Sequence, residues 1–290
     1  MIIYHYILQP LADYGFMRRA LTACFALALG GAPLGVFLVL RRMTLIGDAI
    51  SHAILPGASI AFLCFGLSLT AMTIGGLIAG LIIAVIAGSL TRFTQLKEDA
   101  SFTSTYLLSL TTGVLIISLK GSTTDLMHIL FGNVLAIDNT SLLLVCGIAT
   151  LSTLILAGIY RNLIVECFDS DFIRAQSGKG SWIHQIFLIL VVLNLVAAFQ
   201  ALGTLMALGV MILPSIAARF WTNNIDFTIM FSIAASFIAS FTGLLLSYHY
   251  SLPSGPAIVL TASLIYIGSV IFGRHGSLMT YFFPQRHFAN

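Results

Sequence analysis

The chain has 290 residues, of which 59% are hydrophobic and 8% are charged, and its mean hydropathy is +1.03. Soluble domains carry about 25% charged residues, so this composition excludes an ordinary soluble fold and predicts an all-α, polytopic transmembrane helical bundle. The net charge of +3 is too small and its residues too scattered for a nucleic-acid surface.

The N-terminal segment, residues 1–18, is rich in tyrosine. It lacks the basic-then-apolar order and the small-residue cleavage site of a secretory signal. We expect this segment to be retained and to lie at the membrane interface, where aromatic side chains concentrate.

Nine apolar stretches follow, each near the ~17–25 residues that a spanning helix needs. They lie at residues 20–40, 46–67, 71–90, 103–119, 140–160, 184–201, 204–218, 227–248 and 255–272. Because only Leu202 and Gly203 separate the sixth stretch from the seventh, the seventh could be re-entrant, and we expect eight to nine spanning helices. No soluble-type segment or flexible linker interrupts them, so residues 1–290 are predicted to form one transmembrane domain.

Small residues recur four positions apart at Gly31 and Gly35 and again at Gly76 and Gly80. This spacing lets helix backbones approach closely. Close packing within the chain is the favoured interpretation, and a dimer seam is the other.

Asp48 and His52 lie four residues apart in a run that is otherwise almost wholly apolar from Met43 to Phe65. The i, i+4 spacing puts both side chains on one face of a helix. A charge at the centre of a spanning helix costs about 2.5–3.5 kcal/mol to insert, so it persists only where it is paired, faces a wet cavity or binds a ligand. A carboxylate with an imidazole suits zinc, manganese or iron(II). The other interpretation is a satisfied polar pair that bonds to a neighbouring helix.

Pro56 follows four residues after His52 and has no N–H, so the His52 carbonyl lacks its usual helical donor. Pro56 and Gly57 therefore predict a helix kink beside the candidate ligands. Two ligands alone do not hold a metal. The simplest source of more is the same pair from a second copy of the chain across a two-fold axis.

Two further histidines are candidates for a gate or a transient metal contact. His128 lies in a short segment on the predicted outer side, ahead of a helix stop at Gly132. His249 lies beside the turn signals of residues 251–256. For both, a solvated histidine at the interface is the competing interpretation.

The polar interruption at residues 161–183 contains a short helical pattern. Asp169 and Asp171 come early, Arg174 comes late and Gly178 stands at the stop, which is the order that the helix dipole favours. The pattern predicts either a short amphipathic helix outside the membrane that docks in a groove of another protein, or a solvated connector.

The basic residues predict the topology. If every stretch spans and residues 161–183 are cytoplasmic, ten of the thirteen Lys and Arg residues lie inside and three lie outside, as the positive-inside rule asks. If the seventh stretch were re-entrant, seven of these basic residues would lie inside and six outside. We therefore expect the N-terminus outside and the C-terminus inside.

No phosphate-binding loop, HExxH, GxSxG or dinucleotide motif occurs in a suitable context, so we expect this chain neither to bind nucleotide nor to be an enzyme. Energy for active transport would come from a partner or an ion gradient. The four cysteines show no CxxC spacing, which argues against a disulfide framework or a thiolate metal site.

The segment from Gly35 to Gly57, GVFLVLRRMTLIGDAISHAILPG, closely resembles the signature of the metal-type ABC transporter permeases. Segments at residues 130–133, 201–219 and 252–257 resemble the same family and come in the expected order.

The resemblance implies a homodimeric, multi-pass permease of the bacterial inner membrane, bound to two cytoplasmic ATPase subunits and supplied by an extracytoplasmic metal-binding protein. It implies that Asp48 and His52 contact the transported zinc, manganese or iron(II), with no permanently bound cofactor.

The resemblance also implies that residues 168–178, Phe172 included, are a coupling helix seated on the ATPase. Here the chain departs from the family's common form, Asp-Pro-Glu-Phe-Ala followed shortly by Gly. It has Asp169-Ser-Asp-Phe-Ile instead and places Gly178 one residue late.

Residues and resemblance together predict the permease of an ATP-driven importer for a divalent transition metal. One alternative is a secondary metal/proton antiporter, which would need no ATPase. Another is an ABC permease for a bulky metal chelate, whose path would be lined by non-coordinating residues. A membrane enzyme would need a nucleophile–base constellation that the sequence does not show.

Overall fold

The computed structural model describes residues 9–66, 68–94, 98–118, 137–168, 180–202 and 204–282. Within these ranges every regular element is a helix, which confirms the predicted all-α class. The helices are α1 (Gln9–Asp13), α2 (Gly15–Leu40), α3 (Thr44–Ala53), α4 (Leu55–Phe65), α5 (Leu69–Phe93), α6 (Glu98–Ser118), α8 (Asn139–Phe168), α10 (Gly180–Leu202), α11 (Thr204–Arg219), α12 (Ile225–Tyr250), α13 (Ser254–Phe272) and α14 (Leu278–Phe282).

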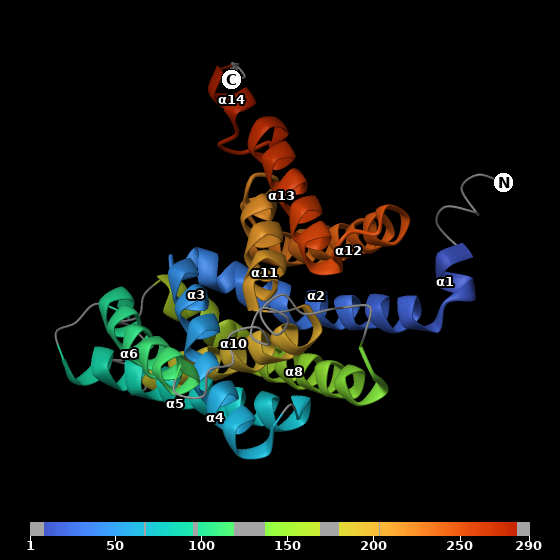
Figure 1. The fold of residues 1–290 in the computed structure, drawn as a ribbon. Helices are drawn as coiled ribbons and strands as arrows, with labels where there is room; N and C mark the ends of the chain where they lie inside the picture. The colour runs from blue at the N-terminus through green and yellow to red at the C-terminus, as the bar shows by residue number, and fades with distance from the viewer. Residues whose placement is uncertain are drawn as a thin grey trace.

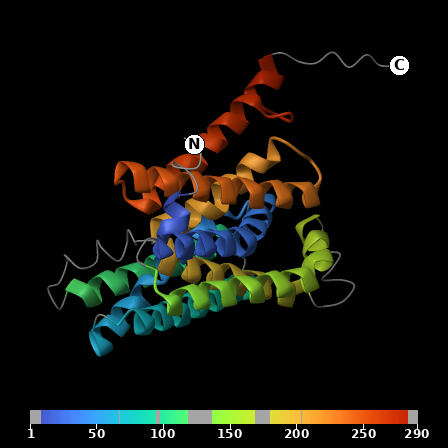
Figure 2. The same cartoon turned by 90° about the vertical axis from the view of Figure 1, so that its right-hand side faces the viewer.

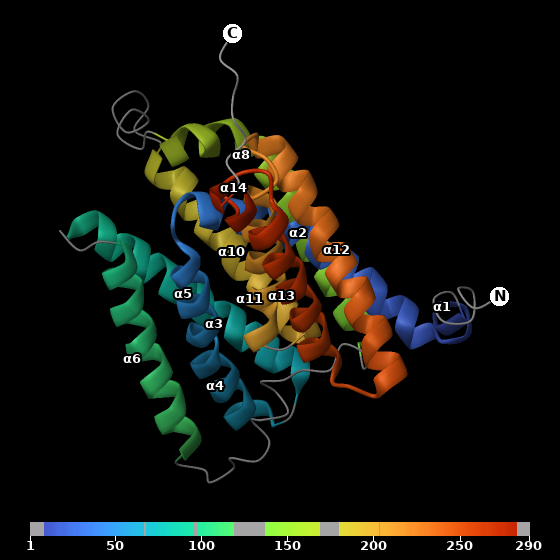
Figure 3. The same ribbon diagram turned by 90° about the horizontal axis from the view of Figure 1, so that it is seen from above.

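Helix α2 is central to the bundle and packs against α8, α10, α11 and α12 (Figure 1). Figure 2 shows α2 between α12 on one side and α8 on the other. The helices α3, α4, α5 and α6 pack on one another, and α6 lies at the edge of the bundle far from α12 (Figure 3). The candidate ligands on α3 therefore lie between the central helices and this outer helix.

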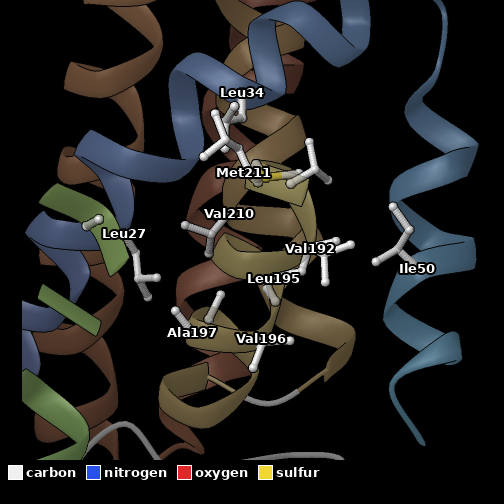
Figure 4. Close-up of a cluster of buried hydrophobic side chains, with 14 of the residues drawn as sticks. Leu27, Leu34, Ile50, Val192, Leu195, Val196, Ala197, Val210 and Met211 are labelled. Carbon is white, nitrogen blue, oxygen red and sulfur yellow. The ribbon is translucent and has the colours of Figure 1, made fainter. Parts of the chain in front are cut away.

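The main core forms where α2, α10 and α11 meet. Leu34, Leu195 and Met211 are buried there, and Ile50 extends the core to α3 (Figure 4). Because Ile50 faces this core, the opposite side of α3 is turned away from the core and toward α6. That opposite side carries the candidate ligands.

Six helices in the described ranges are individually long and apolar enough to cross a membrane, namely α2, α5, α8, α10, α12 and α13. Helices α4 and α11 are apolar but shorter. The expected count of eight to nine spanning helices is therefore not confirmed by helix length and composition.

Helix α8 also runs further than the sequence pattern predicts. The apolar stretch ends near residue 160, whereas the helix continues to Phe168. The polar residues at 161–168 are thus helical, and among them Glu166 is buried.

The small residues predicted to allow close packing do so within the chain. A Cβ built on Gly35 would lie 2.1 Å from the Met211 carbonyl oxygen of α11, and one on Gly76 would lie 2.5 Å from Ile54 Cγ2. Each glycine therefore stands at a helix–helix contact where even a methyl side chain would clash.

We predict that Gly35→Ala destabilises the protein by about 1–3 kcal/mol, the usual penalty for overpacking a core. The matched control is Gly147→Ala on α8, where an added Cβ meets nothing within 4 Å. There the change should be neutral or slightly stabilising, because alanine is the better helix former. Thermal unfolding in detergent measures both, and equal melting temperatures for the two variants would contradict the prediction.

Candidate metal-translocation site

The helix that carries the candidate ligands is joined to α2 by a tight turn. The N–H of Arg42 donates to the Val39 carbonyl at 3.2 Å, and the N–H of Met43 donates to the Leu38 carbonyl at 2.8 Å. These bonds form a Schellman motif, in which Arg42 takes the left-handed position that glycine usually occupies, with φ of 57°. The start of α3 is thereby fixed to the end of α2.

A break separates α3 from α4. The helix is interrupted at Ile54, two residues before Pro56, and Gly57 lies in the first turn of α4. The two pieces have 10 and 11 residues, or about 32 Å together at 1.5 Å per residue, which matches the ~30 Å hydrocarbon core of a bilayer. The break thus falls near the middle of one bilayer-length segment.

Gly57 has a packing role besides its place beside the break. A Cβ built on it would lie 2.0 Å from the Gly75 carbonyl oxygen of α5. The backbones of α4 and α5 touch here, so the second half of the broken helix is held against a long neighbour.

Asp48 and His52 face each other on α3. Asp48 Oδ1 lies 3.6 Å from His52 Nε2, which is beyond ordinary hydrogen-bond distance. Two ligands about 2.1 Å from one ion in tetrahedral geometry lie about 3.4 Å apart. The observed separation is close to that spacing.

Neither candidate ligand is fully covered in the single chain. The Asp48 side chain is 56% exposed and that of His52 is 29% exposed. Leu45, one turn earlier on the same face, is 71% exposed. An acid exposed in the middle of a membrane-spanning segment would need a wet cavity, an ion or another protein surface to cover it.

The imidazole of His52 has an aromatic neighbour that the sequence did not indicate. The ring of Tyr106 on α6 is stacked beside it, with 6.3 Å between ring centroids and 30° between the planes. Tyr106 stands in an apolar stretch with no local pattern that ties it to α3, so its position could be found only from the fold.

No group of three or more His, Cys, Asp or Glu side chains that could hold a metal occurs in the part of the chain that the structure describes. The fold brings Asp48 and His52 together and does not add His249 to them. His249 is exposed near the end of α12, where its ring lies 5.2 Å from that of Tyr248. Tyr248 in turn lies 5.6 Å from Tyr14, so His249 belongs to an aromatic group near the start of α2.

The remaining candidates lie outside the described residues. These are His128 and the coupling-helix residues Asp169, Asp171, Phe172, Arg174 and Gly178.

A buried ion pair lies between the ends of α2 and α8. Arg41 Nη2 donates to Glu166 Oε1 at 3.2 Å, with side chains 10% and 5% exposed. The Arg41 guanidinium also lies over the Phe187 ring of α10, 5.6 Å from its centroid. From the sequence, Arg41 serves as a topology marker and Glu166 as a loop acid, and no short-range pattern pairs them.

Comparisons with known proteins agree with this architecture. Residues 13–273 match the ABC 3 transport family. Two relatives are the manganese transport system membrane protein MntC of Halalkalibacterium halodurans, 35% identical over 96% of this chain and 94% of that protein, and the chelated iron transport system membrane protein YfeD of Yersinia pestis, 31% identical over 93% and 90%. The solved structure of PsaBC from Streptococcus pneumoniae in complex with Fab superimposes with a TM-score of 0.82 at 29% identity, covering 96% of this chain and 99% of that chain.

The spanning helices and these matches identify a multi-pass membrane permease. The chain belongs to the ABC 3 transport family, and it is accordingly a transport subunit of the cytoplasmic membrane.

Proposed function

We propose that the chain is the permease subunit of an ATP-driven importer that passes a bare divalent transition-metal ion between two copies of itself. The observation that carries the proposal is the Asp48–His52 pair, held 3.6 Å apart on a broken helix. The carboxylate supplies charge and the imidazole favours borderline metals. A site with few ligands from each chain releases its ion readily, as conduction requires.

The metal follows from donor chemistry and from the relatives. MntC is named for manganese and YfeD for chelated iron. An oxygen and a nitrogen donor suit manganese and iron(II), and they suit zinc equally. We favour a bare ion over a chelate because a chelate already fills the metal's coordination positions and would leave Asp48 and His52 no ligand role.

A second copy of the chain would complete the site. One chain supplies two ligands, and its own helices leave Asp48 exposed and cover His52 only in part. A two-fold axis beside α3 would bring two carboxylates and two imidazoles together, giving the four ligands of a tetrahedral site. The same contact would cover the exposed acid.

Cytoplasmic ATPase subunits and an extracytoplasmic metal-binding protein are the proposed partners. Residues 168–178, with Asp169, Asp171, Phe172 and Arg174, would be the coupling helix that moves with the ATPases. That movement would open the path to each side in turn, as alternating access requires. His128 and His249 remain candidates for an outer gate.

We further propose nine crossings, with α3 and α4 together forming one of them, and with the N-terminus outside and the C-terminus inside. Residues 1–18 would lie at the outer interface. The distribution of basic residues, ten inside and three outside, supports this topology.

Membrane reporter fusions at residues 225 and 285 test the topology. In the nine-crossing form, position 225 is the first residue of α12 and both fusions report from the cytoplasm. An eight-crossing form with a re-entrant α11 would move position 285 to the outside, so an external signal there would rule out nine crossings.

The transport proposal predicts ATP-dependent uptake. Proteoliposomes whose ATPases face the lumen should accumulate Mn²⁺ when ATP is enclosed and the metal-binding protein is outside, and a proton gradient alone should not drive uptake. The control is an ATPase variant that binds ATP without hydrolysing it. Uptake by the chain without any ATPase, driven by a proton gradient, would instead identify an antiporter.

A further inference from the structure

Helix α6 presents one face to the break between α3 and α4. Tyr106, Ser109 and Gly113 are spaced at i, i+3 and i+7, so they share one side of the helix. Each of them meets a different residue of the broken helix. Figure 1 shows α6 beside α3 and α4, at the edge of the bundle.

The first contact is the ring pair. The Tyr106 ring lies 6.3 Å from the His52 imidazole, with 30° between the planes. This separation is within the range of stacked aromatic pairs. A ring stacked on one side of an imidazole restricts rotation of that imidazole about its Cβ–Cγ bond.

The second contact is a hydrogen bond to the end of α3. The Ser109 hydroxyl is buried and donates to the Ala53 carbonyl at 3.3 Å. Ala53 is the last residue of α3, and carbonyls in the last turn of a helix lack intrahelical donors. A side chain of α6 therefore ties down the helix end one residue after His52.

The third contact is steric. A Cβ built on Gly113 would lie 2.9 Å from Pro56 Cγ and 3.0 Å from its Cα. Only glycine at this position lets α6 lie against the proline. The three contacts together fix the ring, the helix end and the proline of one short segment.

We propose that this face of α6 positions the metal-binding pair, with Tyr106 setting the plane of the His52 imidazole and Ser109 holding the end of the helix that carries it. Tyr106 is a positioning residue and not a ligand. This inference rests on the proposed function, and it adds the residues that set affinity and metal preference. Groups that orient metal-binding histidines typically change metal affinity or activity about 10–100-fold when removed.

The test compares Tyr106→Phe with Tyr106→Leu in the reconstituted complex. The phenylalanine keeps the stacked ring, so its KM for Mn²⁺ should stay near wild type. The leucine removes the ring, so its KM should rise about tenfold, with an altered ratio of Mn²⁺ to Zn²⁺ uptake. The matched control is Tyr266→Leu on α13, a half-buried tyrosine on a helix remote in sequence from the pair.

Ser109→Ala is the second variant, and it should raise the KM several-fold. Its control is Thr112→Ala, because the Thr112 hydroxyl donates at 2.7 Å to the Leu108 carbonyl of its own helix. If Tyr106→Leu fails to assemble, Ser109→Ala decides the question. A wild-type KM and a wild-type metal ratio in the assembled Tyr106→Leu variant, or in Ser109→Ala where that variant decides, would overturn the proposal.

The variant Asp48→Ala distinguishes a failure of this inference from a failure of the proposed function. Loss of uptake in Asp48→Ala with unchanged kinetics in both α6 variants would leave the proposed function standing and remove only the positioning role. Unchanged uptake in Asp48→Ala would remove the proposed metal path itself.

Discussion

Alanine in place of Asp48 or His52 is expected to abolish metal uptake while the protein still assembles in the membrane. Each change removes one of the two donors that the chain supplies, and in a two-fold site it removes two of four. Uptake should fall by more than the roughly 10–100-fold that follows loss of a group that only orients a ligand. Manganese accumulation in cells that lack their own importer measures it.

Assembly should survive because neither side chain supports the core. Asp48 is 56% exposed in the single chain. Inserting an acid into the membrane costs about 2.5–3.5 kcal/mol, and removing the charge of Asp48 removes this cost. Leu154→Ala is the control, since Leu154 is exposed on α8, away from the proposed dimer contact, and has no donor atom. It should retain uptake.

Two near-isosteric variants sharpen the test. Asp48→Asn keeps the shape and removes the charge, and His52→Gln keeps a polar group of similar reach and removes the ring nitrogen. Both should fail in transport while co-purifying with the ATPase. Wild-type accumulation in any of these ligand variants would remove the pair from the metal path.

Local features of the sequence predict the helices well. Every one of the nine apolar stretches coincides with a helix or, at residues 46–67, with the pair α3 and α4. The reason is physical: in lipid, a segment must satisfy its own backbone hydrogen bonds, so a long apolar run has few alternatives to a helix. The break at Ile54 lies beside Pro56 because a proline acts on its own helical turn.

Contacts between residues far apart in the sequence cannot be predicted from such local features. Ser109 bonds to a carbonyl 56 positions away, and Arg41 pairs with an acid 125 positions away. A periodic pattern shows which face of a helix is apolar, but it does not show which helix covers that face. The candidate ligands were recognisable because they are neighbours on one helix, whereas the residues that hold them in place come from other helices.

Glu166 shows how a local pattern misleads. It belongs to the interruption at residues 161–183, whose other charged residues include Arg161 and Asp169 and favour a solvated loop. In the fold α8 continues through it, and the side chain turns inward to Arg41. A charge of opposite sign at the end of another helix, invisible to any short window, decides its burial.

Removing one partner of the Arg41–Glu166 pair is the second change with a large expected effect. Arg41→Met alone, or Glu166→Leu alone, should destabilise the protein by about 3–5 kcal/mol, because each leaves a buried charge without its counterion. The Arg41→Met change also removes the guanidinium that lies over the Phe187 ring. Unfolding in detergent with increasing denaturant measures the loss.

The double variant Arg41→Met with Glu166→Leu should be more stable than either single variant. Two apolar side chains of similar volume leave no buried charge, and such replacements are often neutral or better. Double-mutant cycles isolate this coupling. If the double variant loses as much stability as the two single losses added together, the side chains act independently and the contact contributes little.

Transport in the same variants shows what the pair does beyond stability. Arg41 caps the C-terminal end of α2, and a Schellman turn joins it directly to α3. Glu166 lies in the last turn of α8, just ahead of residues 168–178. The pair therefore links the helix of Asp48 and His52 to the segment proposed to contact the ATPase. A double variant that is stable and bound to ATPase, yet couples ATP hydrolysis poorly to uptake, is the result expected if this link transmits the ATPase movement. Full coupling in that variant would limit the ion pair to holding the two helix ends together.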